Sequence, residues 1–193
     1  MTPAALLLLL CAALGWEPAA ASQVYRECPD KPVLQHFDPL RFQGPWYELR
    51  RQPNLFEPNS VCVTGNVSVA ADGTIAIVNK WRDIANSKNI VLDGVIRRER
   101  NTSEDGKMTV NFSYNGLDTP YWVLGTDYVE YAVVWSCMLT GTHEYTGYAW
   151  VLGRSKELGD AARDAVHEIE QRAEVDTSLY EDTRHEDCPA LAS

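Results

Sequence analysis

The cysteines carry the clearest chemistry in this chain of 193 residues. One of the five, Cys11, lies in an apolar segment at the N-terminus. The other four stand far apart in the chain, at Cys28, Cys62, Cys137 and Cys188. Four cysteines in an exported protein predict two disulfide bonds, and their number alone allows three pairings.

No other residue pattern indicates a reactive centre. The chain has no Cys-x-x-Cys pair and its four histidines are scattered, whereas zinc ligands recur at short, fixed spacings. No arrangement of serine, histidine and aspartate suggests an activated nucleophile. We therefore expect no metal site, no cofactor and no enzyme activity.

The N-terminus has the pattern of a secretory signal peptide. A short apolar run, Leu6 to Leu14, precedes the small residues Ala20, Ala21 and Ser22. The run is too short to span a bilayer. We expect cleavage near Ser22, which leaves a signal peptide (1–22) and one secreted, extracellular domain (23–193).

The charge of the chain argues against nucleic acid as a partner. The formal net charge at pH 7 is −10, and it becomes −9 when the leader, whose one charged side chain is Glu17, is removed. The sequence offers no basic stripe for a phosphate backbone.

Eight short stretches beyond Pro45 read as β-strands separated by turn signals. Their number and spacing are typical of a β-sandwich or a β-barrel. The stretches are Trp46–Arg51, Val61–Val69, Ile75–Trp81, Ile90–Arg98, Met108–Tyr114, Tyr121–Gly125, Tyr131–Cys137 and Tyr145–Leu152.

Alternation within the strands assigns side chains to two faces. In the stretch 108–114, the inner face takes Met108, Val110, Phe112 and Tyr114. In the stretch 61–69, the inner face takes Val61, Val63, Val67 and Val69, while Cys62 and Asn66 point outward. An outward cysteine suits a disulfide to a chain end that runs over the outside of the sheet.

The last two strands are apolar on both faces, which requires a second layer outside the sheet. The segment after them supplies it, because apolar residues recur there at helical spacing. We expect Asp160 to be the N-cap of this helix. Its buried side holds Ala162, Val166, Ile169 and Ala173, and its solvent side holds Arg163, Asp164, Glu168 and Arg172. The tail, 176–193, is polar, and we expect it to be irregular.

Three Asn-x-Ser/Thr sequons predict N-glycosylation, at Asn66, Asn101 and Asn111. Alternation points Asn66 and Asn111 outward, and Asn101 lies in a polar hairpin turn.

Three motifs in the chain resemble those of the lipocalin family. Gly44-Pro-Trp46 resembles its Gly-x-Trp motif on the first strand. Thr126-Asp-Tyr128 is similar to its second motif, before the seventh strand, and Arg154 matches the third. Together, in this order and spacing, they are far more specific than any one of them.

Longer stretches are similar to the branch that includes apolipoprotein D and its arthropod relatives, the Lazarillo, bilin-binding and crustacyanin-like lipocalins. These stretches are 120–128, 148–154 and Cys188-Pro189, and the similarity runs from about residue 28 to residue 189.

This resemblance implies the fold and the pairing of the disulfide bonds. The fold is mainly β: an eight-stranded antiparallel up-and-down β-barrel with one C-terminal α-helix packed on the outside. The disulfides are Cys28–Cys137 and Cys62–Cys188, and Asn66 is a glycosylated position. At the base of the barrel, near Gly44, Trp46 is a plug with the Arg154 guanidinium stacked on it. Gly44, Trp46 and Arg154 are then structural residues and not ligand contacts.

The resemblance also implies a small hydrophobic ligand in the barrel lumen: a fatty acid, a steroid, a retinoid or a pigment-like tetrapyrrole or carotenoid. Alternation turns mostly apolar and aromatic side chains inward, among them Val69 and Val123. The expected ligand-binding residues are Trp150, Asn79, Phe112, Tyr114, Tyr121, Val67, Ile77, Trp81 and Tyr148.

Four of these residues, Trp150, Asn79, Phe112 and Tyr121, fall on pocket positions of apolipoprotein D-like lipocalins, whereas Val67 replaces a tyrosine there. Asn79 and the tyrosine hydroxyls are expected to orient one polar end of the ligand, such as a carboxylate, ketone or hydroxyl.

Three alternatives stay open. A barrel filled by its own side chains has no cavity. One lipocalin branch isomerises prostaglandins with a free thiol inside the barrel, although the implied pairing uses every mature cysteine here. In the third, the chain is a subunit of a pigment- or lipid-associated complex that acts through exposed loop residues such as Leu55 and Phe56. That role includes transient membrane or lipoprotein contact. In every case we expect the chain to be a monomer or a weak oligomer.

Overall fold

The computed structural model of the protein describes residues 23–100, 102–114 and 116–188. The predicted signal peptide (1–22), the sequon at Asn101 and Pro189 lie outside the described residues.

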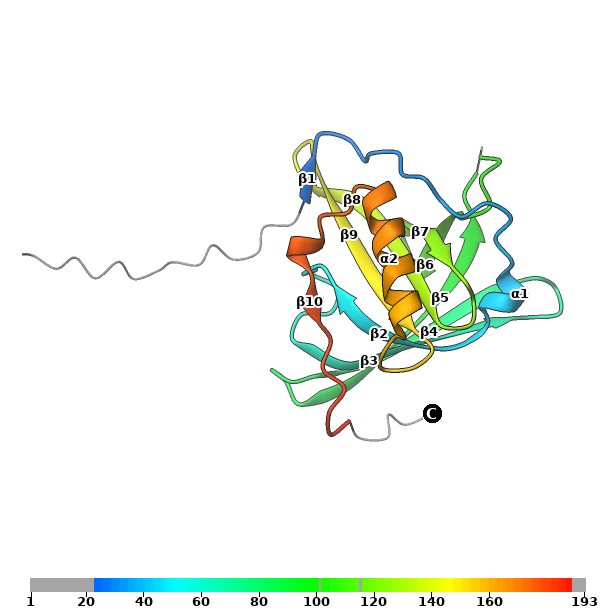
Figure 1. The fold of residues 1–193 in the computed structure, drawn as a ribbon. Coiled ribbons are helices and arrows are strands. Elements are labelled where there is room, and N and C mark those ends of the chain that lie inside the picture. Colours follow the sequence, from blue (N-terminus) through cyan, green and yellow to red (C-terminus); the bar gives the residue numbers. More distant parts are fainter. Residues whose placement is uncertain (1–22, 101, 115, 189–193) are drawn as a thin grey trace, which may run out of the picture.

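Eight antiparallel strands close into a barrel, because each pairs with its neighbour in the chain and the last pairs with the first (Figure 1). Closure removes the unpaired edges that an open sheet presents. The structure therefore confirms the predicted up-and-down barrel and excludes the sandwich. The strands are β2 (Gly44–Arg51), β3 (Ser60–Val69), β4 (Ile75–Asp83), β5 (Lys88–Arg98), β6 (Lys107–Phe112), β7 (Asp118–Thr126), β8 (Tyr131–Gly141) and β9 (Glu144–Gly153).

The barrel has two ends, defined here by the direction of β2. This strand begins at the base, beside the short helix α1 (Pro39–Phe42), and ends at the mouth. The loops 52–59, 84–87 and 142–143 connect strands at the mouth. Helix α1 was not predicted from the sequence; the Asp38 carboxylate caps it by accepting from the Leu40 N–H at 2.9 Å.

Strand β6 ends at Phe112, two residues before the predicted end. The chain turns there, and the Gly116 N–H donates to the Phe112 carbonyl at 3.1 Å. Gly116 adopts a positive φ of 64° that favours glycine. Tyr114 consequently lies in the turn, 59% exposed, with its ring stacked on that of Phe112.

Alternation in β3 is broken by an extra residue. The pairing of β3 with β4 shifts between Val61 and Thr64, as in a β-bulge. Val61 therefore pairs with Arg82 on the outer face, and the prediction that Val61 shares the inner face with Val63 is wrong. Cys62, at the bulge, adopts a positive φ of 60°.

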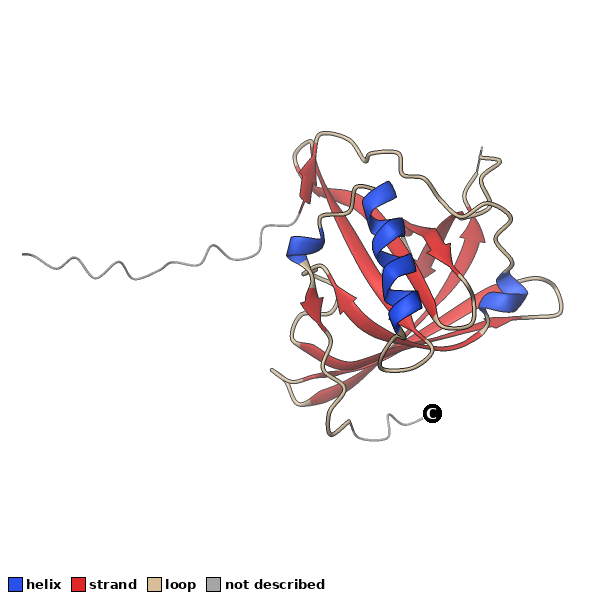
Figure 2. Ribbon diagram, in the orientation of Figure 1, coloured by secondary structure: helices blue, strands red, loops and turns tan. Residues whose placement is uncertain are grey.

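Helix α2 (Asp160–Arg172) lies across the outer face of the barrel, over β7 and β8 (Figure 2). Its buried side carries Ala162, Val166 and Ile169, as predicted. A Cβ atom at Gly125 would lie 2.5 Å from Ile169, so this glycine lets the helix approach the sheet. The N-cap is Gly159 and not Asp160, because Gly159 has an extended backbone (φ −65°, ψ 164°) and Asp160 is already the first helical residue.

The strands under α2 separate two hydrophobic cores, which confirms the two-layer prediction. In β8, Val133 and Trp135 pack outward in the core under the helix. Ala132 packs inward, in the core at the base of the barrel. The double-sided apolar pattern of β8 and β9 thus follows from burial on both faces.

Both ends of the described chain, near residues 23–28 and at Cys188, are tied to the barrel. Disulfides Cys28–Cys137 and Cys62–Cys188 confirm the pairing that the resemblance implied. The short strand β1 (Gln23–Tyr25) pairs with β9. These links hold the N-terminal arm against the outside of β8 and β9.

The C-terminal tail is more ordered than predicted, and it forms part of the barrel wall. After the 3₁₀ turn η1 (Thr177–Leu179), strand β10 (Glu181–Asp182) pairs with the mouth end of β2 (Figure 1). The Thr183 N–H then donates to the Leu49 carbonyl at 2.9 Å, and the Cys62 N–H donates to the Arg184 carbonyl at 2.8 Å. Since direct pairing between β2 and β3 stops at Tyr47 and Thr64, the tail fills the gap that opens between them.

Candidate ligand-binding cavity

The barrel encloses a cavity to which all eight of its strands contribute. Its volume is about 140 Å³. The barrel is therefore not filled by its own side chains, and it has room for one small ligand. The lining residues are Trp46, Glu48, Phe56, Glu57, Val63, Thr64, Gly65, Val67, Ile77, Asn79, Trp81, Leu92, Val110, Phe112, Tyr114, Thr119, Pro120, Tyr121, Val134, Ser136, Trp150 and Leu152.

Eight of the nine predicted ligand-binding residues line this cavity: Trp150, Asn79, Phe112, Tyr114, Tyr121, Val67, Ile77 and Trp81. The ninth, Tyr148, is buried behind the lining. Phe56 packs edge to face against it, with ring centroids 5.5 Å apart, and takes its place in the lining. Val69 and Val123 are also absent from the lining; Val123 is fully buried in the core at the base.

The base of the cavity is built around Trp46. The Arg154 guanidinium lies 3.6 Å from the centroid of its indole, as predicted. Arg154 also donates to the carbonyls of Pro45, at 2.9 Å, and Tyr128, at 3.1 Å. Gly44 has a φ of 97°, and a Cβ atom there would lie 3.3 Å from Arg154 Nη1. Trp46 is part of the cavity lining as well; its role as a structural residue and not a ligand contact stays a prediction.

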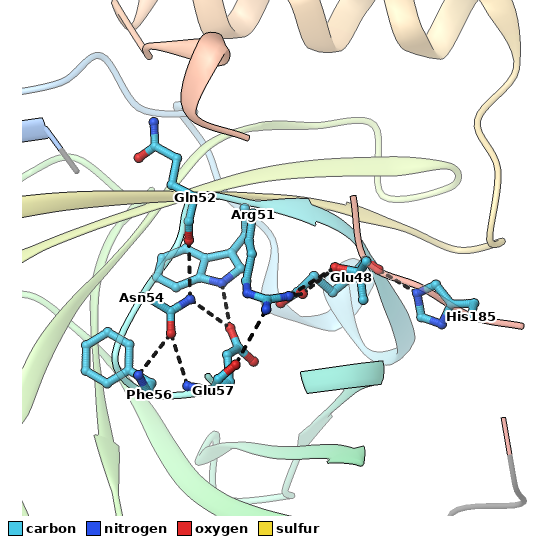
Figure 3. A network of polar contacts seen from close by, with 9 residues as sticks. Glu48, Arg51, Gln52, Asn54, Phe56, Glu57 and His185 are labelled. Carbon is cyan, nitrogen blue, oxygen red and sulfur yellow. Dashed lines mark hydrogen bonds and ion pairs between the residues drawn. The ribbon is translucent and has the colours of Figure 1, made fainter. Parts of the chain in front are cut away.

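A cluster of buried charged residues at the mouth was missed by the sequence analysis (Figure 3). Glu48 and Arg51 form an ion pair, with 2.8 Å between Arg51 Nη1 and Glu48 Oε1. The Thr183 hydroxyl, from the tail, donates to the same Glu48 oxygen at 2.5 Å. Arg51 Nη2 donates to the Glu57 carbonyl oxygen at 3.5 Å.

A β-bulge in β2 turns both members of this ion pair inward. Pairing with β9 shifts between Glu48 and Arg50, so Glu48 lies opposite Leu152 and Arg51 lies opposite Trp150. Regular alternation would instead have placed Glu48 and Arg50 on one face. Arg50 points outward and pairs with Glu170 of α2, with 3.0 Å between Nη2 and Oε1.

The loop 52–59 places a second carboxylate beside Glu48. Asn54 Oδ1 accepts from the N–H groups of Phe56 and Glu57, at 3.0 and 3.1 Å, and so fixes the turn. Glu57 Oε1 accepts from Trp150 Nε1 at 3.0 Å and from Asn54 Nδ2 at 3.2 Å. The carboxylate is thereby held against the tryptophan of the cavity wall.

Burial changes the titration of the cavity groups. Burial, and secondarily the charge of Glu57, raise the pKa of Glu48 to about 8, although Arg51 and Thr183 oppose the shift. Burial also raises the pKa of Tyr121 above its usual 10.0, so its hydroxyl stays protonated. The cavity is therefore apolar along its walls and carries acid groups near its mouth.

Two of the predicted glycosylation sites, Asn66 and Asn111, lie among the described residues. Asn66 is exposed on β3, whereas the Asn111 amide donates to the Gly116 carbonyl and to Asp118. Glycosylation of either stays a prediction. In the described part of the chain, no group of three or more His, Cys, Asp and Glu residues is arranged to hold a metal ion. No helix among these residues is long and apolar enough to cross a membrane.

Comparison with known proteins agrees with the barrel and its motifs. A family model for a lipocalin-like domain matches residues 37–184. The chain is 33% identical to apolipoprotein D of Macaca fascicularis over 97% of this chain and 98% of that protein. It is 27% identical to the bilin-binding protein of Pieris brassicae, over 77% and 79% of the two chains. The fold matches that of insecticyanin from Manduca sexta, with a TM-score of 0.75 and 22% identity over 86% and 91% of the chains.

Proposed function

The chain belongs to the lipocalin family, and from this premise we propose that it is a secreted carrier that binds and transports a small hydrophobic ligand in its barrel. The observation that carries the proposal is the cavity itself, which is lined by residues of all eight strands and has room for one small ligand. Its walls are rich in aromatic and aliphatic side chains, whose burial against an apolar ligand is favourable.

The proposed ligand surface combines an apolar body with one polar end. Phe112, Ile77 and Trp81 form apolar walls, and Trp150 stands beside the polar groups of the mouth. Bilin-like pigments, steroids, retinoids and fatty acids all have an apolar body of this kind. One relative is named for binding bilin.

Binding without catalysis is proposed because the cavity lacks an activated nucleophile. Both disulfides together engage all four cysteines in the described residues, so none of these thiols is free to act as in the isomerase branch. Among the described residues, the lining contains one serine, Ser136, and no histidine.

Titration of tryptophan emission with retinol, progesterone and bilin tests the proposal. Trp150→Ala should lower the affinity of whichever ligand binds by about 5- to 100-fold, because a stacking wall is lost. Trp122→Phe is the matched control: Trp122 belongs to the core on the outer face of the barrel and packs on Trp135, so its loss changes the emission without touching the cavity. Absence of any saturable response from the wild-type protein contradicts the proposal.

A second candidate function, contact with a lipid- or pigment-bearing partner, is favoured by exposed apolar residues at the mouth. Leu55 is 81% exposed and Ile84 is 46% exposed, and they lie on two neighbouring mouth loops. Co-flotation with phosphatidylcholine vesicles tests it: wild-type protein that floats and Leu55→Ser protein that does not would support a surface role.

A further inference from the structure

We propose that the cavity selects ligands whose polar end is a cationic amine, held at Glu57, over ligands that end in a carboxylate. This inference rests on the proposed function, because it names the chemical class of the ligand that the carrier takes.

The acid side chains of the cavity outnumber its basic ones. Glu48 and Glu57 both line it, and no lysine, arginine or histidine of the described residues does. The nearby cation, Arg51, is buried and paired with Glu48, which with a pKa of about 8 holds a proton over much of the neutral range. Glu57 is therefore the carboxylate that a ligand meets, and a carboxylate ligand would place a second negative charge beside it in a poorly solvated site.

Glu57 is positioned as an acceptor for a donor from outside the protein. Only 8% of the residue is exposed, yet its two side-chain partners, Trp150 Nε1 and Asn54 Nδ2, are neutral and both bind Oε1. Within the described part of the chain, no hydrogen bond reaches Glu57 Oε2. A buried carboxylate with only neutral partners gains strongly from an added cation.

The cavity lining holds a second acceptor. Ser136 lines the cavity from β8, and its buried hydroxyl has no hydrogen-bond partner among the described residues. It pairs across the sheet with Tyr148, whose ring contacts both Phe56 and Trp150. An ammonium group carries three donors and no acceptor, so it matches a carboxylate oxygen and a hydroxyl oxygen together. The neighbouring aromatic faces add cation–π attraction.

The protonation of Glu48 provides an independent signature. Three charged or titratable side chains surround it: Arg51 on β2, Glu57 in the loop, and His185 in the tail, whose Nε2 contacts the Glu48 carbonyl at 2.6 Å. With the pKa of Glu48 at about 8, the empty site holds a proton over much of the neutral range. A bound ammonium favours the ionised carboxylate, so amine binding should release protons and tighten as the pH rises toward 8. Carboxylate binding should do the opposite.

A head-group series with one tail tests the inference: decylamine, 1-decanol and decanoate, titrated into the full-length secreted protein at about pH 7.5, where the amine is charged. We expect decylamine to bind about 10- to 100-fold tighter than decanol, and decanoate to bind more weakly than decanol. Glu57→Gln should remove most of the preference for the amine, measured within the variant as the ratio of its decanol and decylamine dissociation constants. Glu144→Gln is the matched control, because Glu144 is exposed at the same end of the barrel.

The outcomes separate the two proposals. Decanoate binding as tightly as decylamine, or a preference for the amine that survives Glu57→Gln, overturns the inference while saturable decanol binding keeps the carrier function. Binding of none of the three overturns both. Calorimetry in two buffers of different ionisation enthalpy measures the protons exchanged on decylamine binding and needs no variant. Proton release is expected, and proton uptake also overturns the inference.

Discussion

Removal of the disulfide between Cys62 and Cys188 should open the barrel wall near the charged cluster, whereas removal of Cys28–Cys137 should not. The tail that carries Cys188 bridges the gap between β2 and β3 through the backbone of Thr183 and Arg184. The same tail supplies the Thr183 hydroxyl to Glu48. The variants are the two double substitutions to serine, Cys62→Ser with Cys188→Ser and Cys28→Ser with Cys137→Ser.

The two variants should lose similar global stability. Their disulfides close loops of 126 and 109 residues, and the chain-entropy cost depends only on the logarithm of loop length. Each disulfide is thus worth about 4–5 kcal/mol, which lowers the thermal midpoint of a domain this size by on the order of 10 °C. Thermal unfolding followed by circular dichroism measures both midpoints, and each variant is the control for the other because the expected losses of stability are similar.

Local opening distinguishes them. In the variant without Cys62–Cys188, the amide hydrogens of residues 62 and 183 should exchange much faster with solvent. Each of them donates to a carbonyl on the other side of the contact between the tail and the barrel, Arg184 and Leu49 respectively, and this contact opens when the disulfide is removed. Its affinity for decanol should fall several-fold, while the other variant keeps wild-type affinity well below its midpoint. Equal amide protection in both variants, or equal loss of affinity, would refute the assignment of the tail to the barrel wall.

Two further predictions concern buried charges. Glu48 binds its proton more tightly in the folded protein, with a pKa of about 8 against the ordinary 4.5 of a solvated glutamate, so the free energy of unfolding should fall as the pH rises between these values. Glu48→Gln should flatten this dependence by on the order of a few kcal/mol; urea unfolding at about pH 5 and about pH 9 measures it, and parallel wild-type and variant curves would contradict the pKa assignment. Arg154→Lys loses the stacking on Trp46 and the bonds to Tyr128 and Pro45, and should cost about 2–3 kcal/mol. Urea unfolding with the exposed Arg26→Lys as control checks this, and equal stability of the two variants would count against a structural role for the stacked pair.

Much of the barrel could be predicted from local patterns, because inward and outward side chains alternate wherever a strand is regular. The double-sided apolar pattern of β8 and the helical spacing of 162–173 together indicated the second layer outside the sheet. Eight cavity residues followed from alternation and from the family resemblance in the same way.

Alternation fails where a strand contains an extra residue. The bulge between Val61 and Thr64 reverses the face of Val61, and the bulge between Glu48 and Arg50 turns Arg51 inward. A pattern of period two contains no sign of the insertion, since the register is set by the partner strand. Alternation alone therefore could not place Arg51 on the inner face beside Glu48.

The charged cluster combines three segments, and the sequence of each segment on its own is typical of the protein surface. Glu48 belongs to a strand, Glu57 to a loop with exposed Leu55, and Thr183 to a polar tail. They become an interior site only because β2 and β3 diverge at the mouth and the tail closes the gap. Closure excludes water from Glu48, and that same exclusion raises its pKa and strengthens every electrostatic contact a ligand makes there. The disulfide at Cys62 thus ties to the wall the tail segment that covers Glu48, and no strand pattern could identify that segment.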